Sequence, residues 1–105
     1  MLHSPGQCGD LEVFQPHYIE RFDGESVILH CSYTSVFEPK GGRYWWLKDP
    51  GLEVKPTRPE FRGRLNSSTD ERFLLCGRAD IKLWDLRPSD SGIYYCIVHI
   101  DENLL

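Results

Sequence analysis

Cysteine and histidine are the residue types in this chain that carry nucleophilic or metal-ligating chemistry, and there are four of each. The cysteines lie far apart, without a Cys-x-x-Cys pair, and no histidine spacing suits zinc. Four distant cysteines in a chain of 105 residues are typical of two disulfides formed in an oxidising compartment. The cysteines are Cys8, Cys31, Cys76 and Cys96, and the histidines are His3, His17, His30 and His99.

The other reactive side chains form no pattern typical of an enzyme. The adjacent carboxylates Asp70 and Glu71 fall in an expected solvated turn, and the histidines are spread over different elements. We therefore predict no catalytic site, metal, cofactor or small-molecule substrate. The net charge of −4 gives no support to nucleic acid as a partner.

Short alternating segments separated by turn residues predict an all-β chain with one core, because no segment shows a long helical period. Around Cys31, the alternation turns Val27 and Leu29 inward, while Ile28 and His30 face out. We expect an N-terminal extension over residues 1–10 and a single domain over 11–105. Further strands are expected at 11–16, 43–48, 53–55, 61–67, 79–85 and 93–100, with a turn at 69–78.

Cys31, Trp45 and the run Asp90–Cys96 (Asp-Ser-Gly-Ile-Tyr-Tyr-Cys) follow the order of an immunoglobulin V-set domain. The chain resembles this family. The resemblance implies an immunoglobulin-like, V-type antiparallel β-sandwich, a disulfide between Cys31 and Cys96, and Trp45 packed on that disulfide. The other structural residues that it implies are Tyr94 at a tyrosine corner and the ion pair of Arg64 and Asp90.

Cys8 and Cys76 are left over by that pairing. Cys8 precedes the first expected strand, and Cys76 lies in the turn between the strands at 61–67 and 79–85. In a V-type sandwich these two positions lie at the same end of the domain. The resemblance therefore implies a second disulfide, Cys8–Cys76. The alternatives are two free thiols or an intermolecular bond.

Residues 101–105 are too few for the strand G that closes a V-set sheet. We therefore expect strand G to be truncated or absent. The strand at 93–100 would then be an open sheet edge unless a partner chain covers it, because natural proteins cover or pair such edges. The other interpretation is that the sequence given omits strand G.

Adjacent Trp45 and Trp46 must point to opposite sides of their strand. With Trp45 assigned to the core by the resemblance, Trp46 is expected on the outer face of the sheet made by strands C (43–48), C′ (53–55) and F (93–100). Aromatic residues are enriched at interfaces, although exposed ones covered by loops are the alternative. The predicted partner-binding residues are Tyr44, Trp46, Lys48, Tyr95, Ile97 and His99.

The tripeptide beginning at Asn66 (Asn-Ser-Ser) matches the acceptor pattern for N-glycosylation. A glycan on the strand at 61–67 would lie away from the predicted binding face. Glycosylation at Asn66 is therefore compatible with binding there.

Three further stretches point to one group of receptors within the V-set family and not only to its fold. They are Gly-Leu-Glu-Val-Lys at 51–55, Pro-Glu-Phe-Arg-Gly-Arg-Leu at 59–65 and Arg-Phe-Leu at 72–74. Over residues 11–100 the chain resembles the V domain of the natural cytotoxicity receptors of natural killer cells. The resemblance implies an extracellular, cell-surface immune receptor that binds a cell-surface protein ligand, B7-like in that family, with a membrane anchor outside this sequence. The alternative is a V domain that pairs with itself or with a second V domain through the same face.

Overall fold

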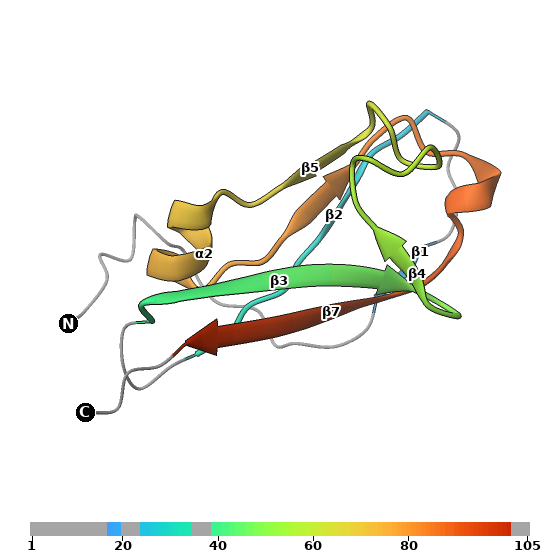
Figure 1. Cartoon of the computed structure of the whole chain (residues 1–105). Coiled ribbons are helices and arrows are strands. Elements are labelled where there is room, and N and C mark those ends of the chain that lie inside the picture. Colours follow the sequence, from blue (N-terminus) through green and yellow to red (C-terminus); the bar gives the residue numbers. More distant parts are fainter. Residues whose placement is uncertain (1–16, 20–23, 35–38, 102–105) are drawn as a thin grey trace.

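The computed structural model describes residues 17–19, 24–34 and 39–101, which form two antiparallel sheets packed face to face (Figure 1). The expected all-β V-type sandwich is confirmed. The first sheet has the order β1 (His17–Ile19), β7 (Gly92–Asp101), β3 (Gly41–Lys48) and β4 (Leu52–Val54). The second sheet has the order β2 (Val27–Leu29), β6 (Ile81–Leu83) and β5 (Leu65–Ser67).

The core fills the space between the two sheets, because every second residue of each strand points inward. The disulfide between Cys31 and Cys96 crosses this space, with 6.3 Å between the two Cα atoms. This confirms the pairing that the resemblance implied. The buried apolar side chains are Ile19, Leu29, Trp46, Val54, Phe61, Leu65, Phe73, Ala79, Ile81, Leu83, Leu86 and Tyr94.

β3 and β7 are the two longest strands, and they pair along the whole length of β3. Gly42 lies in this pairing at φ 158°, where a Cβ atom would come within 2.6 Å of the His99 carbonyl oxygen. Glycine therefore allows the two backbones to approach at the end of the ladder. This long pair is the platform on which the candidate site is built.

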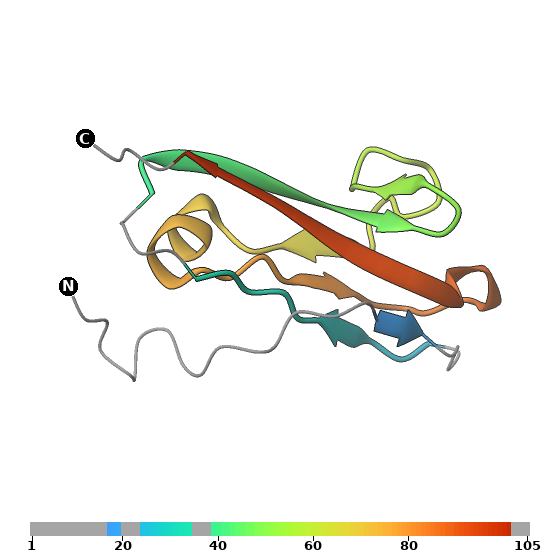
Figure 2. The same cartoon turned by 90° about the horizontal axis from the view of Figure 1, so that it is seen from below.

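The edge of β7 is covered at its start by β1, which pairs antiparallel with Gly92–Tyr94. Figure 2 shows β7 running on well past β1. Within the described ranges, the start of this edge is therefore not open as expected, since an N-terminal strand lies beside its first residues. The strand expected at residues 11–16 lies outside the described residues.

A short helix, α2 (Asp70–Cys76), occupies the region that we expected to be a simple turn. Thr69 caps its N-terminus by accepting a hydrogen bond from the Arg72 backbone N–H, and Gly77 ends it in the left-handed conformation at φ 70°. Phe73 anchors α2 in the core. Seven residues are too few to show a helical period in the sequence.

Residues 61–64 were predicted as strand but form a turn. The Phe61 N–H donates to the Arg58 carbonyl, and the Arg64 N–H donates to the Phe61 carbonyl. Gly63 at φ 78° allows the chain to reverse there. The strand therefore begins only at Leu65. The turn places Arg64 at the base of the sandwich, beside the 3₁₀ helix η1 (Pro88–Asp90).

No helix in the described part of the chain is long and apolar enough to cross a membrane. Within the same residues, His, Cys, Asp and Glu side chains form no group of three or more that fits a metal ion.

Candidate protein-interaction face

The register of β3 and β7 decides which side chains lie on the outside of the sheet. Trp46 pairs with Cys96, whose side chain points inward to the disulfide. The next pair, Trp45 with Ile97, therefore points outward. We define the outer face as the side chains of Arg43, Trp45 and Leu47 from β3 and of Tyr95, Ile97 and His99 from β7.

Trp45 is the aromatic centre of the outer face. The Arg43 guanidinium lies 5.6 Å from the centroid of its ring, and the His99 ring lies 5.8 Å from it in a tilted arrangement. A cation over an indole is attracted by the ring quadrupole. Between these neighbours the indole is half-buried, and the rest of its ring is an apolar surface on the outside of the sheet.

The sequence-based assignment of the two tryptophans is wrong. Trp46 is only 1% exposed, and its Nε1–H donates to the Ala79 carbonyl oxygen at 2.8 Å. Its partner across the ladder is the disulfide-bonded Cys96, and side chains directly opposite in a ladder share a face. Trp46, not Trp45, is therefore the core tryptophan, and Trp45 takes the outward position.

Tyr44 and Lys48 change sides together with Trp46, because an alternation counted one residue off moves every side chain to the other face. The Tyr44 hydroxyl donates to the Ser68 carbonyl at 2.9 Å, and its ring packs 4.9 Å from that of Phe73. The Lys48 ammonium donates to the Ser89 carbonyl and lies over the Tyr94 ring. Neither side chain belongs to the outer face.

The three residues predicted on the last strand do lie on the outer face. Tyr95 and Ile97 are half-buried, and His99 is exposed. The Tyr95 hydroxyl donates to the Asp49 carboxylate at 3.0 Å, and this hydrogen bond, followed by desolvation, raises the pKa of the Tyr95 hydroxyl. Tyr95 is thus fixed at the edge of the apolar surface next to Leu47, its partner in the ladder.

The outer face continues onto β1. Tyr18 pairs with Ile93, and both side chains are exposed, Tyr18 to 66% and Ile93 to 37%. Ile93 lies on the same side of β7 as Tyr95 and Ile97 because the three are two residues apart. The apolar surface therefore extends from Trp45 to Tyr18, across three strands.

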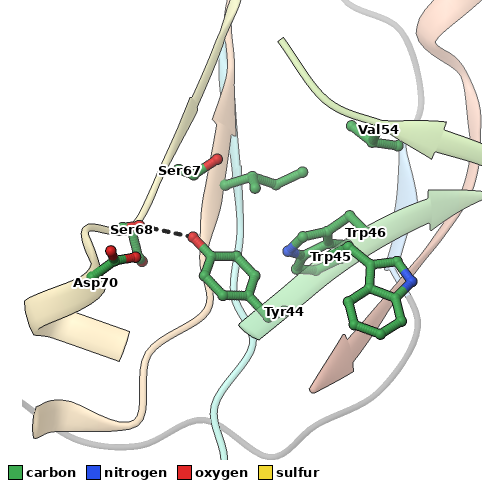
Figure 3. A pocket seen from close by; sticks show the side chains of 8 residues that line it. Tyr44, Trp45, Trp46, Val54, Ser67, Ser68 and Asp70 are labelled. Carbon is green, nitrogen blue, oxygen red and sulfur yellow. Dashed lines mark hydrogen bonds between the residues drawn. The ribbon is translucent and has the colours of Figure 1, made fainter. Parts of the chain in front are cut away.

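A cleft of about 260 Å³ opens on the other side of β3, between the two sheets (Figure 3). Tyr44 and Trp46 point into it, whereas the Trp45 indole is turned away. The residues around it are Tyr44, Trp45, Trp46, Val54, Ser67, Ser68, Asp70 and Ile81. The cleft follows from the shortness of β4, which covers β3 only from Trp46 to Lys48.

A buried ion pair fixes the base of the sheet below the outer face. Arg64 donates to both carboxylate oxygens of Asp90, at 2.8 and 3.0 Å. Burial by itself would raise the pKa of the Asp90 carboxyl, but hydrogen bonds from Arg64 and from the Arg87 backbone outweigh it, and the pKa lies below its ordinary value.

The Tyr94 hydroxyl donates to the Asp90 carbonyl at 2.6 Å, which makes the tyrosine corner. Burial, with the charge of Asp90, raises the pKa of the Tyr94 hydroxyl. The corner and the ion pair share Asp90, so they fix the start of β7 and with it the position of Tyr95.

A second polar cluster, which was not predicted from the sequence, lies beside the disulfide. Arg78 is 5% exposed, and its guanidinium donates to the Asp80 carboxylate and to His30 Nδ1. Asp80 Oδ1 also accepts the backbone N–H of Cys31 at 2.9 Å. The sequence signal for this cluster was an arginine and an aspartate two residues apart, Arg78 and Asp80, at the start of an expected strand. Their contacts with His30 and Cys31 could not be predicted from it, because only the fold brings the two segments together.

The remaining predicted residues lie away from the outer face. Asn66 is exposed on β5, in the opposite sheet, where a glycan would be clear of the face. Cys76 at the end of α2 is disulfide-bonded. Its predicted partner Cys8 lies outside the described residues, so the bridge between them stays a prediction.

Comparison with known families agrees with this geometry. The model of the immunoglobulin V-set domain matches residues 14–104. The chain belongs to the immunoglobulin V-set family. This family is not a class of enzymes, and its members carry binding surfaces on a disulfide-linked sandwich.

Curated relatives include natural cytotoxicity triggering receptor 3 of Macaca fascicularis and of Homo sapiens. The first is 41% identical over 100 residues, covering 91% of this chain and 56% of the relative. The second is 39% identical over 104 residues, covering 95% of this chain and 51% of the relative. This V-set chain therefore spans about half the length of these relatives. Its similarity to them is consistent with an extracellular domain of an immune receptor.

Proposed function

We propose that this V-set domain is the ligand-recognition part of a cell-surface immune receptor, and that it binds a protein ligand through the outer face. The observation that carries the proposal is the continuous apolar and aromatic surface centred on Trp45. Its side chains come from regular strands and are held by neighbours, so little conformational entropy is lost when a partner packs on them. The similarity to natural cytotoxicity triggering receptor 3 supports a receptor role.

The ligand class follows from the surface and from the relatives. A mostly apolar patch with Arg43 and His99 at its rim suits a protein surface that offers an apolar knob beside acidic groups. Cell-surface proteins of the B7 type are the first candidates, because the sequence resembles receptors that bind them. An extracellular location is part of the same proposal.

The test compares binding by three bivalent fusions of the domain: wild type, Trp45→Ala and Lys82→Ala. Lys82 is exposed on β6 of the opposite sheet, so its removal is the matched control. The probes are purified B7-family ectodomains and cells with or without trypsin treatment. We expect wild type and Lys82→Ala to bind a trypsin-sensitive target, and Trp45→Ala to lose at least tenfold in affinity, as for an interface hot spot. Equal binding by all three fusions would exclude the outer face.

The alternative function is pairing with a second V domain through the same face. The half-buried apolar side chains of Trp45, Leu47 and Ile97 support this pairing as well as they support ligand binding, because a second copy offers the same apolar surface. In that case Trp45→Ala would dissociate a dimer seen by light scattering. A wild-type protein that stays monomeric would leave only ligand binding.

A further inference from the structure

The cleft between the two sheets is a feature that the outer face does not use. Its volume is about 260 Å³, and every residue that lines it lies within the described ranges (Figure 3). A cavity of about 150 Å³ is enough to hold a benzene molecule. The cleft therefore has room for one large side chain.

The cleft exists because β4 stops early. Its last residue, Val54, lies opposite Trp46. In the same register Pro56 would come opposite Tyr44, and proline has no N–H to give to a carbonyl across the ladder. Counted back from Asp49, whose N–H donates to β7, Tyr44 turns its backbone groups away from β7. The Tyr44 carbonyl therefore has no partner in β4, at a residue that lines the cleft.

The two sides of the cleft differ in chemical character. Tyr44 and Trp46 supply aromatic rings from β3, and Val54 supplies an aliphatic side chain from β4. Ser67 and Asp70 face them from the end of β5 and the start of α2 (Figure 3). The Trp46 Nε1–H and the Tyr44 hydroxyl already donate to carbonyls of the chain. The groups left for a ligand are therefore mainly oxygen acceptors, and the strongest is the Asp70 carboxylate.

Asp70 gives the cleft a negative charge. Its side chain is exposed, and within the described ranges no cationic side chain forms an ion pair with it. A carboxylate beside aromatic rings attracts a cation through its charge and through the ring quadrupoles. A planar guanidinium suits this site better than an ammonium, because it stacks on a ring and donates several hydrogen bonds in fixed directions. The alkyl chain that carries it packs on apolar side chains such as Val54 and Ile81.

We propose that the cleft binds an arginine side chain of a protein ligand, with the guanidinium paired to Asp70 and stacked on Tyr44. The arginine belongs to the ligand of the proposed function, on which this inference therefore rests. Tyr44 and Trp45 are successive residues of β3, and the Trp45 indole turns away from the cleft toward the outer face (Figure 3). A ligand seated on Trp45 needs only to reach over the edge of β3 to place a side chain in the cleft.

The first experiment tests the site without any protein ligand. The probe is arginine capped as acetyl-arginine methylamide, titrated into the domain while NMR follows the backbone amide signals of Tyr44, Ser67 and Asp70. Capped citrulline, capped lysine and free arginine are the comparison probes. The variants are Asp70→Asn and Glu71→Gln. Glu71 is the matched control, because it is the next residue of the same helical turn, is exposed and does not line the cleft.

We expect capped arginine to shift these signals to saturation, and capped citrulline, which has the same shape without the charge, to leave them unchanged. Asp70→Asn should weaken binding about fivefold, as for one ion pair at a partly exposed site, and Glu71→Gln less than about twofold. Equal weakening by both variants, or equal binding of capped lysine, would overturn recognition of a guanidinium. Tighter binding of free than of capped arginine would overturn the assignment to a protein side chain.

A second pair of variants tests the place of binding at constant charge, and it also decides the matter if Asp70→Asn does not fold. Ser67 pairs with Ile81, whose buried side chain points inward, so leucine at position 67 fills the cleft. Asn66 is the preceding residue and points outward, so leucine there leaves the cleft open. Capped arginine should bind Asn66→Leu as it binds wild type, and should not bind Ser67→Leu. Retained binding by folded Ser67→Leu excludes the cleft.

The bivalent fusions separate this proposal from the proposed function. The Asp70→Asn fusion should bind the trypsin-sensitive target about fivefold more weakly than the Glu71→Gln fusion. If Trp45→Ala loses binding while Asp70→Asn and Glu71→Gln bind equally, the outer face stands and the arginine site is wrong. If Trp45→Ala binds as wild type does while Asp70→Asn is weakened, the outer face is wrong and the cleft still recognises the target.

Discussion

The indole of Trp46 combines burial, an apolar contact surface and a satisfied polar atom in one side chain. It lies in the same core cluster as Cys31 and Cys96, and its Nε1–H is paired with the Ala79 carbonyl. Trp45, one residue earlier, has its ring on the surface against Arg43 and His99. Under the proposed function, stability and recognition are therefore divided between two neighbouring residues of the same type.

This division predicts opposite effects of the same substitution. Trp46→Ala should lower the free energy of unfolding by about 3–5 kcal/mol, because it leaves a large cavity and an unpaired Ala79 carbonyl. Trp45→Ala should lower it by about 1 kcal/mol or less, since it removes a surface contact and a cation–π interaction. Urea denaturation followed by fluorescence measures both. Similar losses in the two variants would contradict the assignment of Trp46 to the core.

The Asp90 carboxyl gives the stability a defined dependence on acid. Its pKa is lowered in the folded state, so near and below the ordinary value of about 4 the unfolded chain binds the proton more readily. The contribution of Asp90 is present above that pH and is lost as the pH falls through the lowered pKa.

Between about pH 5 and pH 3, roughly one unit on either side of the ordinary carboxyl pKa, the free energy of unfolding of wild type should therefore fall more steeply than that of Asp90→Asn. The variant should be less stable at neutral pH, because Arg64 is left buried without its carboxylate. Glu25→Gln, which alters an exposed carboxylate, is the control. Parallel pH profiles for wild type and Asp90→Asn would remove Asp90 from this role.

At the scale of the element, α2 closes one end of the sandwich with a single buried side chain. The rings of Tyr33 and Tyr44 pack against the Phe73 ring, with centroids 5.2 and 4.9 Å from its own, and the Tyr33 hydroxyl donates to the Phe73 carbonyl. The helix is too short to be stable alone, so its caps and this contact must hold it.

Removal of the N-cap should therefore be measurable. Thr69→Ala leaves the Arg72 N–H without its side-chain acceptor and should cost about 1 kcal/mol of unfolding free energy. Thr57→Ala, at an exposed threonine outside any helix, should change it by less than about 0.5 kcal/mol. Thermal denaturation of the three proteins tests the difference. An unchanged Thr69→Ala would mean that packing of Phe73 alone holds α2.

The elements differ in how far the sequence could predict them. Alternation counted from Cys96 gave the correct faces for Tyr94, Tyr95 and Ile97, because the cysteine fixes one inward position. In β3 the alternation was counted from Trp45, which the resemblance had assigned to the core, and this starting point was wrong because two adjacent tryptophans both fit a core pattern. Only the pairing of Trp46 with Cys96 decides between them, and that register is not a local property of the sequence.

At the scale of the whole molecule, the Cys31–Cys96 disulfide and the sandwich were predicted from motif residues spread over the chain. The place of β1 beside β7 was not, because it is a long-range pairing of three residues without a sequence signal of its own. It covers the β7 edge from Gly92 to Tyr94. The outer face and this edge are therefore products of the assembled sheet, although each residue in them was visible beforehand.

The antiparallel pairing of β1 with β7 and the disulfide together determine how the domain carries a pulling force. The N-terminal end of β1 points the same way as the C-terminal end of β7, so tension on both would unzip their few hydrogen bonds one after another. Once β1 and then β2, which also precedes Cys31, have peeled away, the load passes through the sulfurs of Cys31 and Cys96. The chain between the two cysteines, which includes β3, is bypassed, so tension on the two ends of the domain draws out β1 and β2 and leaves Trp45 in its strand.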